Sequence, residues 1–432
     1  MIRSATFGAV SFLAVVLASA NLYANDVSTL GDPDEGTSPD LLDGTLSGEG
    51  DLIDDEAPHS SWLRFDGVLQ PWMDFKARFR EDTGINFSGS YGVLGQDYSE
   101  SASDIDDSVG GKLTLNFSRD LLFAGTPDAL TLDVVVEQRG PIGTEFAPLQ
   151  AGILSGSITP TAATWGDFDL GLTQFYIRQN LANNHFQYTI GKIFAPNFIN
   201  AYPFFDDNRQ FLNQTFSTSP TIPSPLRGFG AVAAWYPTDS GAYVQGGVFT
   251  ANSDDTGITV DNFFEDGELF YSVEVGWSSL ARTGTPIQAR GPMDTNNVHL
   301  NFWYKDAQPD AVRIFQPDAK GVAFNANYMA GDSVMWFVRG GISDGWVTDR
   351  NLTVGFGYRP TEHYSDLLGV GVGWSEPAND ALRDQITAEA FYRFQVTPNL
   401  AITPDLQVIW HPSLYPSEDL LVVTSLRART TF

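Results

Sequence analysis

Charged and planar polar side chains recur at every second position in several stretches of this sequence. Glu389 and Arg393 are one such pair, because both fall on the same side of the extended segment TAEAFYRFQVT. Guanidinium, carboxylate and amide groups beside aromatic rings suit a sugar, whose hydroxyls donate and accept hydrogen bonds while its C–H faces pack on rings. The same groups line any water-filled pore, so general polarity is the alternative explanation. The candidates for contact with a solute are Lys112, Glu137, Arg139, Glu274, His299, Asn301, Trp303, Arg339, Glu389, Arg393, Arg427 and Arg429.

Other chemistry has little support. The sequence contains no G-x-S-x-G or H-E-x-x-H motif and no phosphate-binding glycine loop, and its five histidines are dispersed. Glu274 and Glu389 could form a glycosidase pair, but carboxylates are expected in a polar pore anyway. The absence of Cys excludes thiolate metal sites, and the net charge of -29 makes nucleic acid a poor partner. We therefore predict no enzymatic activity, no catalytic residue, no metal and no cofactor.

The segments that carry these side chains have the period of β-strands. Val298, Leu300 and Phe302 alternate with His299 and Asn301, and a similar split between an apolar and a polar face recurs from about residue 85 to the C-terminus. Two architectures use such segments. In a soluble sandwich the apolar faces meet in a core, whereas in a membrane barrel the apolar band faces lipid and the polar face lines a wet lumen.

Several features favour the barrel. Tyr304, Tyr328, Tyr358 and Tyr392 lie near strand ends, as interfacial aromatic girdles do, and the last strand ends flush on Phe432. After the N-terminal segment no stretch of about 18 apolar residues occurs, which excludes an inner-membrane helical protein. At roughly 20 to 25 residues per strand, residues 61–432 predict an all-β fold, a transmembrane antiparallel β-barrel with about 16 strands, 18 being the alternative. A barrel of this size leaves an aqueous channel.

One long stretch, residues 192–227, breaks the alternation and is rich in aromatics. Long loops are usually functional or disordered, and this aromatic content does not fit disorder. We predict a constriction loop folded into the pore; the alternative is an extracellular lid that packs on its own aromatics. Its candidate residues are Phe198, Tyr202, Phe204, Phe205, Asp206, Asp207 and Arg209.

The N-terminal region divides into two parts. Residues 1–24 are typical of a secretory signal peptide, with Arg3 before a short apolar stretch and small residues that allow cleavage after Ala20 or Ala24. Residues 25–60 contain eleven acidic residues and no Lys or Arg. Such a segment repels itself and buries little apolar surface, so we predict an acidic disordered segment. The barrel would then comprise residues 61–432.

Four segments carry a resemblance to a known family. They are WMDFKARFREDTGINFSGSY (72–91), GKIFAPNFINAYPFFDDNRQFLNQTF (191–216), FGAVAAWYPTDSGAYVQGGVFTAN (229–252) and TAEAFYRFQVTPNLAITPDLQVIWHPS (387–413). Together they resemble the OprB family of carbohydrate-selective porins, over roughly residues 62–432. The resemblance implies a sixteen-stranded outer-membrane channel for sugars, with Arg and Glu at its narrowest point, for which Glu389 and Arg393 are the candidates. The acidic segment is not part of the family's pattern.

The sequence thus predicts an outer-membrane porin of a Gram-negative bacterium, for passive, carbohydrate-selective diffusion of mono- or oligosaccharides. Its partners would be sugar solutes, outer-membrane lipid and lipopolysaccharide, with no nucleic acid, and it would be a homotrimer or a monomer. The alternatives are a general porin or one for another substrate, and a secreted β-sandwich that binds glycans.

Overall fold

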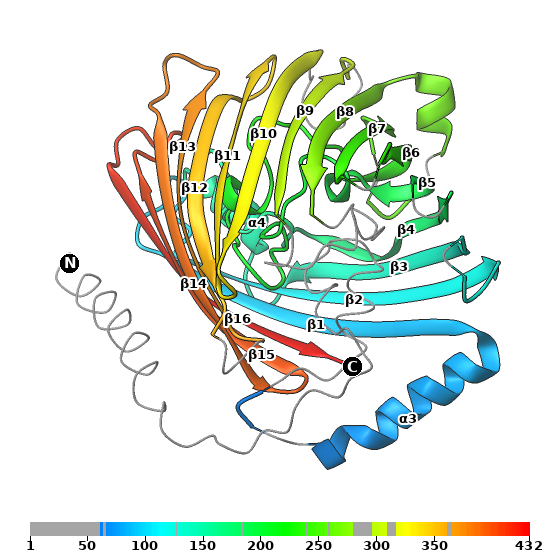
Figure 1. Ribbon diagram of the computed structural model, residues 1–432. Coiled ribbons are helices and arrows are strands. Elements are labelled where there is room, and N and C mark those ends of the chain that lie inside the picture. Colours follow the sequence, from blue (N-terminus) through cyan, green and yellow to red (C-terminus); the bar gives the residue numbers. More distant parts are fainter. Residues whose placement is uncertain are drawn as a thin grey trace. The chain divides into compact units, whose positions relative to one another are not determined.

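The computed structural model describes residues 61–63, 66–126, 128–182, 185–238, 240–253, 255–257, 260–279, 296–308, 317–360 and 365–432. The predicted signal peptide and the predicted acidic segment lie outside the described residues. Within these ranges the chain forms a closed barrel of sixteen antiparallel strands, in which each strand pairs with its neighbours in sequence and β1 pairs with β16 (Figure 1). The predicted fold class is confirmed, with 16 strands rather than 18.

The strands are nine to sixteen residues long, which is enough for tilted strands to cross a bilayer. They are β1 (Ile85–Tyr98), β2 (Asp107–Leu122), β3 (Leu130–Pro141), β4 (Phe168–Leu181), β5 (Phe186–Phe194), β6 (Arg227–Trp235), β7 (Ala242–Thr250), β8 (Leu269–Ser278), β9 (Asn297–Lys305), β10 (Ala319–Ala330), β11 (Val334–Asp344), β12 (Thr348–Tyr358), β13 (Leu367–Pro377), β14 (Gln385–Thr397), β15 (Leu400–Trp410) and β16 (Leu420–Thr431).

The polarity of the wall is the reverse of that in a soluble protein. On β9 the outward Val298, Leu300 and Phe302 are 54%, 46% and 46% exposed, whereas the inward His299 and Asn301 are 1% and 0% exposed. Apolar side chains therefore face out and polar side chains face in, as in a barrel whose outer surface contacts hydrocarbon. This arrangement rules out the sandwich alternative, in which the apolar faces would be buried against each other.

Aromatic side chains gather where the outward face meets the strand ends, as predicted. Tyr304, Tyr328 and Tyr358 are exposed near the ends of β9, β10 and β12, and Trp336 and Trp410 occupy similar positions on β11 and β15. Rings of this kind suit the headgroup level of a bilayer, because they are apolar with a polar tip. Among the described helices, none has the length and apolarity that a membrane-spanning helix requires.

The chain closes the barrel at its last residue. The backbone N–H of Phe432 donates to the carbonyl of Gly89 at 2.8 Å, and that of Gly89 donates to the carbonyl of Phe432 at 2.9 Å. A Cβ at position 89 would lie 2.3 Å from the Phe432 ring, so a larger residue here would force that ring to move. The terminal aromatic therefore completes the pairing of β1 with β16, which leaves no strand edge in lipid.

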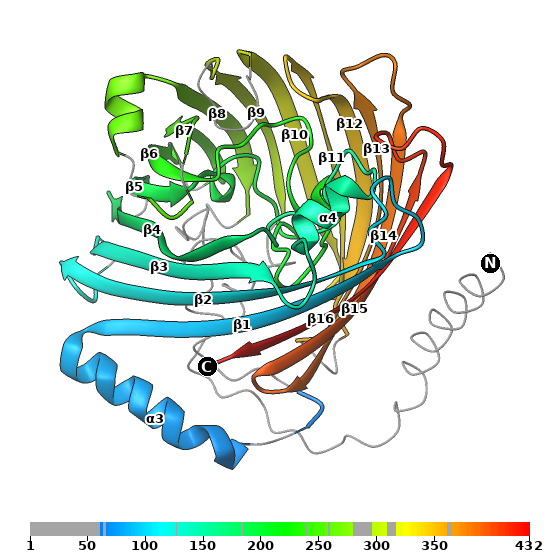
Figure 2. The same cartoon turned by 180° about the vertical axis from the view of Figure 1, so that it is seen from behind.

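The two ends of the barrel differ. One end, here called the C-terminal rim, holds Phe432, the two-residue turn between β14 and β15, and helix α3 (Asp66–Thr83), whose Trp72 and Phe79 rings pack on the outward Phe87 at 5.8 and 5.4 Å. The opposite end, here called the loop rim, carries longer connections. Two of these, residues 142–167 with helix α4 (Pro148–Leu154) and residues 195–226 with helix α5 (Gln214–Ser217), enter the barrel interior (Figures 1 and 2).

Candidate functional site

The constriction loop, residues 195–226, connects β5 to β6 and lies inside the barrel. Its predicted residues Phe198, Tyr202, Phe204, Phe205, Asp206, Asp207 and Arg209 are all buried. The aromatic ones do not pack only on one another. Phe211 contacts Phe391 of β14 at 5.0 Å between ring centroids, and Tyr202 contacts Phe337 of β11 at 5.4 Å. The predicted inward fold of this loop is confirmed, and the lid alternative is wrong, because the loop's aromatics bury themselves against the inner wall.

Inward-facing charges of the wall fix this loop through its backbone. Glu389 accepts hydrogen bonds from the backbone N–H groups of Leu212 and Asn213 at 2.5 and 3.0 Å. Arg427 donates to the carbonyls of Asp207 and Gln210 at 2.6 and 3.0 Å. Both side chains are 1% exposed, and a polar group removed from water needs such partners. These two predicted lumen residues face inward, where they hold the loop in place.

Arg339 of β11 also binds the backbone of the constriction loop, on its other side. Its guanidinium donates to the carbonyls of Asn200, Phe216 and Thr218 at 2.9 to 3.0 Å. The same group lies over the Tyr202 ring, 3.8 Å from the ring centroid, in a cation–π contact. One wall arginine thus ties together segments of the loop that are well separated in sequence.

A second set of inward polar residues surrounds Asn200. Glu274 accepts from the backbone N–H of Asn200 at 3.1 Å and from the Tyr243 hydroxyl at 2.6 Å. His299 contacts the Asn200 amide oxygen at 2.8 Å, and Asn301 donates to Glu274 at 3.4 Å. Asn200 has φ of 52°, a left-handed conformation that asparagine tolerates better than most residues. The predicted candidates on β8 and β9 therefore hold the start of the loop. Trp303 stacks on Phe270 beside them, with ring centroids 5.9 Å apart.

The second inserted segment, residues 142–167, was not predicted. It is joined to the constriction loop by Asp207, whose carboxylate accepts from the backbone N–H of Thr164 at 2.6 Å. Trp165 donates its indole N–H to the Asp207 carbonyl at 3.2 Å, and Lys112 donates to the Thr164 hydroxyl at 2.7 Å. The available signal was the loss of alternation between Pro141 and Phe168, in a stretch rich in Ser, Thr and Ala. Small polar residues gave no hint that the segment turns inward.

A buried ion cluster lies at the base of that segment. Arg227 donates to Glu137 at 2.9 Å, and Arg139 forms an ion pair with the same carboxylate. The guanidinium groups of Arg139 and Arg227 lie over the Phe168 ring, 5.1 and 5.5 Å from its centroid, respectively. Arg139 also contacts the carbonyl of Thr164. Glu137 and Arg139 are thus inward residues engaged in packing. Arg227, the first residue of β6, was not among the predicted candidates.

The tip of the constriction loop is held by an ion pair of its own. Arg209 donates to Asp206 at 2.7 Å, and the backbone N–H of Asn208 donates to the same carboxylate at 2.8 Å. Burial acts to raise the pKa of Asp206, but the positive charges of Arg209 and Arg429 outweigh it and lower that pKa below its ordinary value. Asp206 therefore stays ionised, and the turn at the tip is held by its charge.

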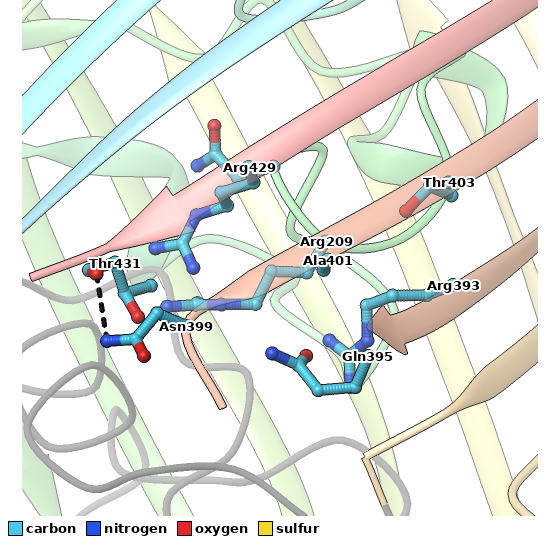
Figure 3. Close-up of a pocket in the computed structure, with 9 residues that line it drawn as sticks. Arg209, Arg393, Gln395, Asn399, Ala401, Thr403, Arg429 and Thr431 are labelled. Atoms are coloured by element: carbon cyan, nitrogen blue, oxygen red, sulfur yellow. Dashed lines mark hydrogen bonds between the residues drawn. The ribbon is translucent and has the colours of Figure 1, made fainter. Parts of the chain in front are cut away.

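Beneath this tip lies a small polar pocket, here called the arginine pocket, with a cavity volume of about 20 Å³ (Figure 3). Guanidinium groups approach it from β14, from β16 and from the loop tip. Arg393 is held from behind, since its Nε donates to the carbonyl of Ser365 at 3.1 Å, and Asn399 donates to the carbonyl of Thr431 at 3.1 Å. The lining residues are Asn208, Arg209, Arg393, Gln395, Asn399, Ala401, Thr403, Arg429 and Thr431.

The candidates therefore fall into two groups. Arg393, Arg429 and Arg209 come together at the arginine pocket, near the C-terminal rim, while the other wall candidates contact the two inserted segments or the packing around them. The prediction missed Asn208, Asn399, Thr403 and Thr431. Thr403 was accessible to the same reasoning, because it lies on the polar face of its strand. Within the described ranges, no three His, Asp or Glu side chains form a group that could hold a metal ion.

Comparisons with known proteins agree with this architecture. A family model described as "Carbohydrate-selective porin, OprB family" matches residues 104–432, well over half of the chain. No curated protein sequence matches the chain. The high pH structure of Pseudomonas putida OprB is similar, with a TM-score of 0.63 at 18% sequence identity, over 87% of this chain and 99% of that one. The low pH structure of the same protein has a TM-score of 0.50 at 14% identity, over 87% and 100% of the two chains. At these identities the structural likeness shows the fold.

Proposed function

Because the chain belongs to the OprB family of carbohydrate-selective porins, it is a passive channel for sugars, and we propose that the arginine pocket is where the lumen contacts them. The assignment describes a channel rather than an enzyme. The single observation that carries the proposal is the position of the pocket. It lies inside the barrel, at the tip of the constriction loop, and it combines guanidinium, amide and hydroxyl groups that can bond to sugar hydroxyls.

The remaining wall candidates have a positioning role in this proposal. Glu389, Arg427 and Arg339 hydrogen-bond to the backbone of the constriction loop and therefore set where its tip lies. Sugar recognition would depend on them through the loop. This differs from the prediction from sequence, in which Glu389 and Arg393 contact the sugar as a pair.

We also propose that the barrel resides in the outer membrane of a Gram-negative bacterium. The family, the apolar outward face and the aromatic residues near the strand ends support this location. The predicted signal peptide in residues 1–24 and an acidic segment in residues 25–60 fit export, with the barrel in residues 61–432. Lipid would surround the outward face and lipopolysaccharide the loop rim. A homotrimer and a monomer are both compatible with the apolar face.

Planar-bilayer recording tests the contact with sugars. Full-length protein should conduct ions, and a mono- or oligosaccharide such as glucose or maltose should reduce the current. Arg393→Gln should raise the half-blocking sugar concentration by about threefold or more, because a hydrogen-bonding fork is replaced by a shorter amide. Arg350→Gln is the matched control, since Arg350 lies on β12 near the loop rim and is 57% exposed. A current that no sugar alters would refute the proposal and favour a general porin.

A further inference from the structure

The outer wall of the barrel has an apolar recess where β4, β5 and β6 meet the connection between β7 and β8. Its cavity volume is about 340 Å³. An apolar cavity of about 150 Å³ is already large enough to take up benzene. This cavity, here called the outer recess, therefore has room for a larger hydrocarbon group. Its lining includes Phe175, Ile177, Ile190, Lys192, Phe229 and Val260.

The outer recess opens on the outward face of the wall. Phe175 and Ile190 are exposed there, like the other outward side chains. Lys192 lies directly opposite Phe175 of β4 and directly opposite Phe229 of β6. Residues directly opposite each other in antiparallel strands project to the same face. The side chains of these strand residues therefore belong to the face that contacts hydrocarbon, and the recess is continuous with that face.

The polar groups of the lining are engaged by the protein itself. Among the described residues of the lining, Lys192 alone has a charged side chain. Its amine donates to the carbonyl of Asp255 at 3.0 Å and also contacts the carbonyl of Gly257. Tyr176 is buried in the inner hydrophobic cluster together with Ile193. What the recess offers to a ligand is therefore mainly hydrocarbon surface.

The connection between β7 and β8 forms a ledge beside the recess. In its short helix η3 (Asn262–Asp266), the rings of Phe263 and Phe264 pack on Phe229 with centroid distances of 5.1 and 5.6 Å. Phe264 is 67% exposed, so the ledge projects from the wall. A second copy of the chain would dock through a broad surface of about 800 Å². A flexible chain fits into a recess beside a ledge, whereas a broad strand wall does not.

The recess begins in the half of the wall next to the C-terminal rim. Ile190 lies four residues from the end of β5 at that rim, roughly 13 Å along a strand that rises about 3.3 Å per residue. Because such strands tilt by about 45°, the height is smaller still, less than half of a hydrocarbon core of about 30 Å. Short turns of these barrels face the periplasm. The adjoining leaflet of an outer membrane is phospholipid.

From these observations we infer that the outer recess binds one acyl chain of a phospholipid. The inference goes beyond the proposed contact with sugars and depends only on the proposed location of the barrel in an outer membrane. Lipid tails are as apolar as the wall, so the hydrophobic effect does not drive this binding. An empty recess would leave its lining without contacts on one side, and a chain that fills it restores those van der Waals contacts.

Photo-crosslinking of a single lipid tests the site. Full-length protein is delipidated in detergent and given one equivalent of a phosphatidylcholine that carries a diazirine in one acyl chain. After illumination, mass spectrometry of the peptides should find about tenfold more label around Ile190 and Phe229 than around Ile342, which corresponds to about 1.4 kcal/mol. Ile342 is the reference because it is exposed on the outward face of β11, away from the recess lining.

Two variants fill the recess from different sides. Ile190→Trp adds volume from the wall and Val260→Trp adds it from the connection, so one variant still serves if the other folds poorly. Each should lower the label in the recess to the level found around Ile342. Ile342→Trp is the matched control, because it makes the same substitution on the same face, and it should leave the recess label unchanged. Heat-modifiable mobility in an SDS gel verifies that each variant is folded.

Three outcomes would overturn the inference. The first is label spread evenly over the outward face of the native protein, and the second is recess label that persists in both filled variants. The third is an unlabelled recess in a native oligomer that Ile190→Trp dissociates, because a second copy would then occupy the recess. The block of the current by sugars is measured separately, so failure of this inference leaves the proposed function standing.

Discussion

At the scale of single residues, the charges inside this barrel are used mainly to fix backbone. Glu389 bonds to two N–H groups of the constriction loop, and Arg339 and Arg427 bond to its carbonyls. A buried polar or charged group must replace its lost hydration with hydrogen bonds, and backbone groups supply them without flexible side chains. Much of the polar face that the sequence predicts to line the pore therefore binds the constriction loop instead.

Glu389→Gln tests this role. Glutamine has one acceptor oxygen, and its amide N–H₂ would face one of the donors of Leu212 and Asn213. We expect a loss of about 1 to 3 kcal/mol in unfolding free energy and a larger, noisier single-channel conductance, because the loop is less firmly held. Glu376→Gln is the control, since Glu376 pairs with the exposed Arg350 near the loop rim. Unchanged conductance and thermal stability in Glu389→Gln would show that the loop does not depend on it.

Asp206 gives a pH prediction. Its pKa lies below the ordinary value near 3.9, so the unfolded chain binds the proton more tightly. The ion pair with Arg209 therefore contributes its full stability above about pH 4 and loses it as the pH falls through the lowered pKa. In Arg209→Gln the main opposing charge is gone, burial dominates, and the loop tip should loosen at a higher pH. When the pH is lowered from 7 to 3, the conductance of the native protein should change at a lower pH than that of the variant. If both change at the same pH, the ion pair with Arg209 does not hold the loop tip.

At the scale of elements, the inner faces of β12 and β13 are shaped to receive the constriction loop. Glycine occupies inward positions of these strands where an aromatic or threonine side chain approaches closely. A Cβ added at Gly371 would lie 2.6 Å from the Phe216 ring, and one at Gly369 would lie 2.2 Å from the Phe391 ring. The other two such positions are Gly355 and Gly373. In β13 the valines therefore form the apolar outer face, and the glycines that alternate with them leave space inside for neighbouring side chains.

Gly371→Val should displace the loop. The added side chain cannot share space with Phe216 of α5, and overpacking of this kind costs about 1 to 3 kcal/mol. We expect a lower thermal midpoint and an altered conductance. Gly246→Ala on β7 is the control, because its added Cβ would meet its nearest neighbour at 4.0 Å. If Gly371→Val behaves like this control, the recess does not determine where the loop packs.

At the scale of the whole molecule, stability depends on closing the ring. The sixteen strands pair in sequence order, and the seam between β1 and β16 ends at the hydrogen bonds between Phe432 and Gly89. In hydrocarbon an unpaired strand edge has no water to bond to, so each lost pair at the seam is costly.

Deletion of Phe432 should weaken this seam. It removes both hydrogen bonds to Gly89 and the ring that packs over it. Unheated native protein should migrate differently from heated protein in an SDS gel, and the deletion should reduce the folded, heat-modifiable fraction several-fold. Phe123→Ala, at an exposed residue in the turn between β2 and β3, serves as control. Equal folded fractions in the deletion and the native protein would show that the seam closes without Phe432.

Much of the architecture could be predicted because the barrel wall is a local property of the chain. Alternation along β9 gives the two faces, the residue count gives about 16 strands, and the aromatic stretch after Lys192 indicates the loop that turns inward. The segment 142–167 was missed because small polar residues carry no periodicity that distinguishes an inserted segment from a surface loop. Thr403, which lines the pocket with Arg393, was missed because alternation cannot tell which inward residues remain accessible.

The sequence by itself determined the faces of the strands, their approximate number, the position of the long aromatic loop and the resemblance to sugar porins. These follow from side-chain polarity at a spacing of two residues, which any extended chain obeys. The tertiary structure alone decided that Glu389 and Arg427 bind loop backbone while Arg393 and Arg429 line a pocket. The physical reason is that the loop tip, which lies between β5 and β6 in the chain, meets β14 and β16 only across the lumen, so these contacts depend on the tertiary fold rather than on neighbours in the chain.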